Sequence, residues 1–83
     1  MSERDDRTLE GLEYRIAFEL YSKDGRRGAK VLEFLHGETF LLELECIDET
    51  WAERHSGRLV GPFASPTDAE HFIIATPWFN GEE

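Results

Sequence analysis

Residues 60–68 read VGPFASPTD, and within this stretch the chain changes from a strand to a helix. The strand runs through Phe63, and Ser65 then stands where the N-cap of a helix is expected. Pro66 at the first helical position already has the backbone angle of a helix and leaves no amide hydrogen unpaired. Asp68 follows Ser65 at the spacing of a capping box. The sequence therefore predicts a helix that begins at Pro66.

The residues after this corner follow a helical period. Apolar positions recur at the i, i+3, i+4, i+7 spacing of a buried stripe, at Ala69, Phe72, Ile73 and Thr76. Pro77 stops this helix, because a residue before proline is biased away from the helical conformation. The helix is too short to persist alone, so we expect it to pack on a sheet.

Upstream of the corner, apolar alternation predicts three strands over residues 14–20, 29–35 and 39–47. In the first, the even positions are expected to point inward. The second is apolar on both faces, which is typical of a central strand or one covered twice. In the third, Glu43 and Glu45 are expected to place one face in water. The connections are too short for a parallel crossover, so the strands are expected to form an antiparallel meander.

Residues 48–57 leave two alternatives open. Asp48 could cap a short helix. The favoured alternative is a hairpin in which residues 50–55 turn at Ser56 and Gly57 into a strand over residues 58–60. The predicted fold is thus α+β, an antiparallel meander sheet of 4–5 strands with one C-terminal helix packed on a face. Residues 1–12 are predicted to form a flexible N-terminal tail, and residues 13–83 a single small domain.

The charge balance limits the kinds of partner. The chain has 18 acidic and 9 basic residues, which gives a net charge of −9 at pH 7. Such a surface repels nucleic-acid phosphates and anionic membranes but tolerates a basic protein. Residues 1–7 contain no apolar segment of a secretory signal, and no apolar run approaches a membrane-spanning length. We therefore expect a cytoplasmic protein with a protein partner, without direct binding to nucleic acid or membrane.

Three groups of residues are candidate interaction surfaces. An acidic segment without Lys or Arg spans residues 38–53 and contains Glu38, Glu43, Glu45, Asp48, Glu49 and Glu53. A basic turn holds four of the nine basic residues, Lys23, Arg26, Arg27 and Lys30. The aromatic tail, Trp78 and Phe79, either packs in the core or forms an exposed apolar patch that points to a contact site.

No catalytic, metal or cofactor motif stands out. Cys46 is the only cysteine, and neither it nor the three histidines has the local spacing of a metal site. Cys46 is also expected on an apolar strand face, where a thiol is inert. We therefore predict a non-enzymatic protein-interaction module without a cofactor, with homodimerisation as one form of that interaction. The alternative is an acidic inhibitor that mimics nucleic acid and binds a basic partner.

The corner also resembles part of a known family. Residues 60–70, VGPFASPTDAE, look like the strand-to-helix corner of SPOR domains, small bacterial modules that bind septal peptidoglycan. The resemblance covers eleven residues and implies, as a further alternative, a bacterial peptidoglycan-binding module. No binding residue is transferred, because the strand–helix–strand order of that family is not predicted here.

Overall fold

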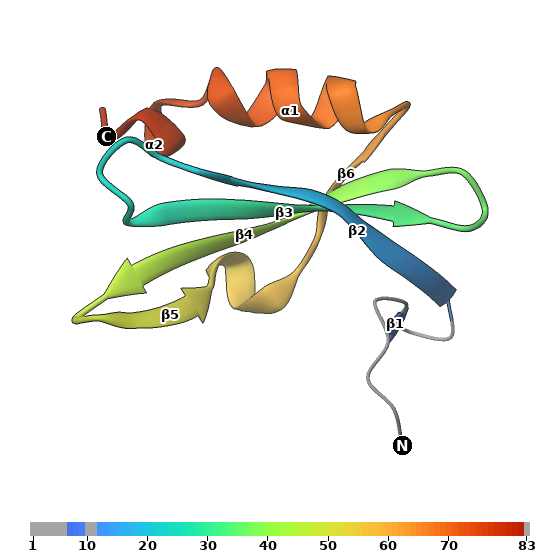
Figure 1. The fold of residues 1–83 in the computed structure, drawn as a ribbon, viewed down its shortest axis with the longest axis horizontal. Helices are drawn as coiled ribbons and strands as arrows, with labels where there is room; N and C mark the ends of the chain where they lie inside the picture. The colour runs from blue at the N-terminus through green and yellow to red at the C-terminus, as the bar shows by residue number, and fades with distance from the viewer. Residues whose placement is uncertain (1–6, 10–11, 83) are drawn as a thin grey trace.

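The computed structural model describes residues 7–9 and 12–82 of the chain. Six strands form one antiparallel sheet: β1 (Arg7–Leu9), β2 (Leu12–Tyr21), β3 (Arg27–Phe34), β4 (Thr39–Ile47), β5 (Thr50–Glu53) and β6 (Val60–Phe63). A 3-10 segment, η1 (Arg54–Gly57), links β5 to β6. The helices α1 (Pro66–Ile74) and α2 (Pro77–Asn80) follow and lie on the same side of the sheet (Figure 1). The predicted α+β fold, a meander with a C-terminal helix packed on it, is confirmed.

The strand order is β1-β2-β3-β4-β5, and β6 also pairs with β4. β5 pairs with residues 44–47, whereas β6 pairs with Thr39 and Leu41, so the two share the edge of β4 that faces away from β3. The favoured hairpin of residues 50–55 with 58–60 is therefore wrong in its pairing. A strand does begin at Thr50, but it ends at Glu53 and gives way to η1.

The predicted corner is confirmed in detail. The Ser65 hydroxyl accepts a hydrogen bond from the Asp68 backbone N–H at 3.2 Å, and Pro66 is the first residue of α1. Ala69 and Ile73 of the expected stripe are fully buried. Phe72 lies at the margin of the stripe, in contact with the Phe63 ring at 5.2 Å. The corner thus fixes which side of α1 packs on the sheet.

The core lies between the two helices and one face of the sheet. Trp78 and Phe79 of α2 are buried in it, which decides between the two alternatives left open for the aromatic tail. The remaining buried members come from β3, β4 and α1, namely Ala29, Val31, Leu41, Ala69 and Ile73. In the described residues both α-helices follow β6, and only the short 3-10 segment η1 lies between two strands, so the order of strand, α-helix and strand of SPOR domains does not occur there.

A bulge in β2 changes the faces that the sequence predicted. Ile16 pairs with Leu32 but Phe18 pairs with Val31, so Ala17 is an extra residue. Phe18 therefore packs on the core beneath the helices, whereas Ile16 shares the opposite face with Leu32. The prediction that all even positions point inward is wrong because one inserted residue reverses the alternation.

The faces of β4 are also reversed. Leu41 pairs with Val31 and packs on the core, and Glu43 has the same parity and is only 3% exposed. The expectation that this face lies in water is therefore wrong for Glu43.

Residues 7–9 were assigned to the tail by the sequence, and the structure pairs them with residues 12–14 of β2.

Candidate interaction surface

The sheet face opposite α1 and α2 is apolar along the long strands, and we call it the open face. Register and alternation place on it, from β2, β3 and β4, Tyr14, Ile16, Leu32, Phe34, Phe40, Leu42, Leu44 and Cys46. Leu32 and Phe34 are buried but lie outside the core cluster beneath the helices. Both α-helices of the described residues lie on the other side of the sheet (Figure 1). The open face is therefore a second apolar layer without a helix on it.

One end of the open face is an aromatic cluster around Phe34. Its ring centroid lies 5.1 Å from Tyr14, 5.3 Å from Phe40 and 5.6 Å from His36. These rings approach at tilted or edge-to-face angles, which are the favoured geometries of aromatic pairs. The cluster shields Phe34 with other side chains of the same face.

The other end carries the two most exposed aromatic residues of this face. Tyr21 is 53% exposed and Trp51 is 44% exposed, and their rings meet edge to face at 5.8 Å. The Tyr21 ring extends across its register partner Gly28, where a Cβ would come within 2.9 Å of it. The Tyr21 hydroxyl donates to Glu19 at 2.7 Å, and this hydrogen bond raises the pKa of Tyr21 above 10.0. Tyr21 is thus held in place and still presents its ring to solvent.

Few charges interrupt the open face. Glu19 and Lys30 stand opposite each other in the β2–β3 register and are the charged residues of this face on β2, β3 and β4 from Tyr14 onward. On β5, Glu53 pairs with Leu44 and adds one carboxylate on the side of Trp51. The next charged pair of the same strands, Arg15 and Glu33, lies on the helix side and forms an exposed salt bridge of 2.9 Å.

The structure does not gather the acidic segment into one patch. Glu38 lies in the β3–β4 turn, where its carboxylate is 2.7 Å from Nε2 of His36. Asp48 and Glu49 form the β4–β5 turn at the other end of β4. Glu45 and Glu53 lie on strands that pair at this second end. The length of β4 therefore separates Glu38 from Asp48 and Glu49, although all three belong to one acidic segment of the sequence.

Glu43 lies in a polar network inside the molecule. Its Oε1 accepts from an Arg54 N–H at 2.7 Å and lies 3.0 Å from Nε2 of His55. The Arg54 guanidinium also stacks over the Trp78 ring, 4.2 Å from its centroid. His55 and Ser56 have left-handed backbone angles (φ 59° and 58°), which non-glycine residues rarely adopt. This cluster ties β4, η1 and α2 together, and no local motif in the sequence indicated it.

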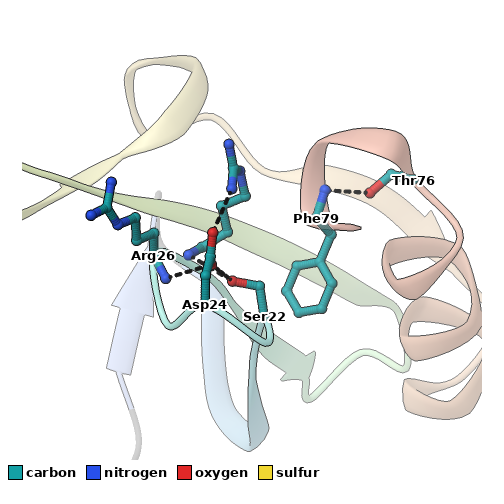
Figure 2. Close-up of polar contacts among 6 residues, drawn as sticks. Ser22, Asp24, Arg26, Thr76 and Phe79 are labelled. Atoms are coloured by element: carbon teal, nitrogen blue, oxygen red, sulfur yellow. Dashed lines mark hydrogen bonds and ion pairs between the residues drawn. The ribbon is translucent and has the colours of Figure 1, made fainter. Parts of the chain in front are cut away.

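The four residues of the basic turn are also not gathered at one place. Asp24 lies at its centre, where its carboxylate accepts from the Ser22 hydroxyl at 2.6 Å, from the Arg26 backbone N–H at 3.0 Å and from Arg27 at 3.3 Å (Figure 2). The Ser22 hydrogen bond, followed by that of Arg26, holds the pKa of Asp24 below its usual 3.8. Lys30 instead belongs to the open face. The four basic residues therefore do not form one anion site.

A cavity of about 410 Å³ lies between this turn and the end of α2. Figure 2 shows Phe79 beside the turn, with its backbone N–H bonded to the Thr76 hydroxyl. Lys23 and Asp24 line the cavity on one side, and Asn80 and Glu82 on the other. The charged residues of its lining are one lysine and two acids, so the cavity favours no single class of charged ligand.

No family model, no curated protein and no solved structure matches this chain. Within residues 7–9 and 12–82, no three side chains of His, Cys, Asp or Glu gather as metal ligands. No helix in the described part is long and apolar enough to cross a membrane. The register of β2, β3 and β4 makes the open face the candidate interaction surface.

Proposed function

We propose that this chain is a non-enzymatic protein-interaction module that contacts its partner through the open face. One observation carries the proposal, namely that β3 is apolar on both sides and the helices cover one of them. Val31 packs beneath α1, whereas Leu32 and Phe34 point to the open face. A strand that is apolar on both sides is typical of a sheet covered on both faces. Neighbouring side chains of the open face shield Leu32 and Phe34, which are 2% and 4% exposed, so the residues around them form the surface that a partner would contact.

Tyr21 and Trp51 supply the exposed part of this contact. Large aromatic residues dominate the binding energy of many interfaces, because each buries a large area with little loss of side-chain freedom. These residues replace Trp78 and Phe79 as the proposed aromatic contact, since both of the latter pack in the core.

The alternative of a nucleic-acid mimic is less well supported. Such a mimic needs a continuous array of exposed negative charges in the place of phosphates. Here Glu43 is buried, and Glu38 lies at the opposite end of β4 from Asp48 and Glu49. The arrangement of the carboxylates therefore favours the apolar contact.

Photo-cross-linking tests the proposal. A photoreactive phenylalanine analogue replaces Tyr21 in the full chain, inside the cells that produce it. The matched control carries the same analogue at Phe72, a 43% exposed aromatic residue on α1, across the sheet from the open face. We expect a discrete protein adduct from Tyr21 and not from Phe72. No adduct at Tyr21, or equal yields at the two positions, would overturn the proposal.

A further inference from the structure

We infer that the partner on the open face is a second copy of this chain, related by a two-fold axis that runs parallel to the strands between β2 and β3. The inference rests on the proposed function and adds the identity of the partner. It follows from two properties of the open face, which are its charge pattern and its apolar pattern.

The charge pattern is self-complementary. Glu19 on β2 and Lys30 on β3 are register partners and lie on the same face. A two-fold axis between these strands places β2 of one copy over β3 of the other at the same height. Each Lys30 then lies over Glu19 of the second copy, so two pairs of opposite charge form across the interface.

The same rotation matches the apolar residues. Ile16 and Leu32 are register partners, as are Tyr14 and Phe34, so each residue lies over its partner in the second copy. Sheets that pack face to face keep their strands within about 30° of each other. A rotation of one sheet against the other by this angle displaces the residues near the two-fold axis least. Apolar side chains thus meet apolar side chains along the centre of the contact.

The proposed axis limits the size of the contact. It places β2 of each copy over β3 of the other, whereas β4 lies over β1, which pairs only with residues 12–14. The eight residues of β3 span ~26 Å and two neighbouring strands span ~10 Å, which gives roughly 260 Å² of flat area. This area is well below the ~800 Å² per partner of a standard interface, so we expect a weak dimer that forms and dissociates reversibly.

Net charge does not prevent this association. The charge of −9 repels a second copy at long range, but salt at physiological strength screens exposed charges beyond ~8 Å. Glu19 and Lys30 cancel each other on the contact itself. The repulsion therefore slows the approach of two copies more than it weakens their contact.

A charge-swap experiment tests the inference. Sedimentation equilibrium of the full chain gives the dimer dissociation constant. Glu19→Lys and Lys30→Glu, made singly, each place like charges over one another and are expected to raise this constant about tenfold or more. The double variant restores opposite charges and is expected to return it to within about threefold of the original. If a swapped variant fails to fold, the milder variants Glu19→Gln and Lys30→Met serve instead, because they remove the charge and keep the length of the side chain. They are expected to raise the dissociation constant of the dimer about threefold.

The matched control swaps the charges on the other face of the same two strands. Arg15→Glu with Glu33→Arg is expected to leave the dissociation constant unchanged. A chain that stays monomeric at high concentration, or a double variant as weak as the single ones, would overturn the inference. If the protein is monomeric and Tyr21 cross-links to a different protein, the inference fails while the proposed function stands. If Tyr21 gives no adduct, the proposed function fails as well.

Discussion

Glu43 shows how one buried charge organises its surroundings. A carboxylate taken out of water costs several kcal/mol unless other groups satisfy it. Arg54 and His55 both approach its Oε1, and both come from the short segment η1. The left-handed turn that brings His55 to Glu43 costs about 1–2 kcal/mol per non-glycine residue. The network therefore holds a backbone shape that η1 would not adopt alone.

Removal of Arg54 is expected to be costly. Arg54→Met leaves Glu43 buried beside His55 and removes the stacking over Trp78, so we expect a loss of ~3 kcal/mol in the free energy of unfolding. Arg15→Met, which breaks the exposed salt bridge to Glu33, should cost under ~1 kcal/mol. Urea denaturation measures both variants. Equal losses of unfolding free energy in the two variants would show that the burial of Glu43 does not cause the loss in Arg54→Met.

The β4–β5 turn offers a gain in stability. Asp48 and Glu49 form a two-residue hairpin loop, and both have positive φ, 54° and 67°. Asn-Gly is preferred there, because Asn tolerates and Gly freely adopts this conformation. Asp48→Asn with Glu49→Gly should therefore stabilise the protein by ~1 kcal/mol, which raises the melting temperature by about 4–8 °C. A lower melting temperature in calorimetry would contradict this prediction.

Asp24 should titrate below its usual range. Its pKa is lowered mainly by the Ser22 hydrogen bond, so its charged form is favoured in the folded state. The associated stability is present above the unfolded pKa and is lost as the pH falls through the folded pKa. A carboxyl NMR titration should place this pKa below 3.8, and Ser22→Ala should raise it. No change in Ser22→Ala would mean that another group stabilises the charge.

At the scale of elements, Thr76 joins the two helices. Its hydroxyl donates to the Ile73 carbonyl of α1 at 2.8 Å and accepts from the Phe79 N–H of α2 at 3.2 Å. Thr76→Val keeps the shape but removes the cap, so we expect a loss of ~1 kcal/mol. Thr67→Val, at an exposed position of α1, is the control and should cost a few tenths of a kcal/mol. Thermal denaturation distinguishes the two, and equal effects would rule out the cap as the reason.

The sequence predicts the helices and strands more accurately than it predicts which side of each strand is buried. Ser65, Pro66 and the stripe through Ile73 specify α1, because capping and helical period are local properties. β4 has apolar residues at both parities, so the buried side could not be assigned without knowing that Arg54 and His55 satisfy Glu43. In β2, the bulge at Ala17 reverses the alternation, and no local residue pattern signals it.

The open face was partly visible in the sequence. Residues 29–35 are apolar at both parities, which indicated a strand that needs cover on two sides. The pairing of Tyr21 with Trp51 was not visible, because these residues are distant in sequence and belong to β2 and β5. Their contact depends on the sheet order and on Gly28, which leaves room for the Tyr21 ring.

At the scale of the whole molecule, the proposed dimer makes stability depend on concentration. Dimerisation stabilises the folded chain by mass action, so a tenfold higher protein concentration should raise the melting temperature by a few degrees. Lys30→Glu should reduce this dependence, and the Arg15→Glu, Glu33→Arg control should retain it. Differential scanning fluorimetry over a dilution series measures the effect. A melting temperature independent of concentration would contradict the dimer.

The bulge at Ala17 has a consequence for how far such an assembly can grow. In the described residues, β1 pairs only with residues 12–14, so the rest of β2 forms an edge of the sheet. The bulge interrupts this edge, and Arg15 and Glu19 add charge beside it, which hinders the addition of further strands. In the proposed dimer both copies also use the same surface, so the contact closes on itself. The proposed association would thereby end in a closed particle of fixed size and not in an open-ended fibre.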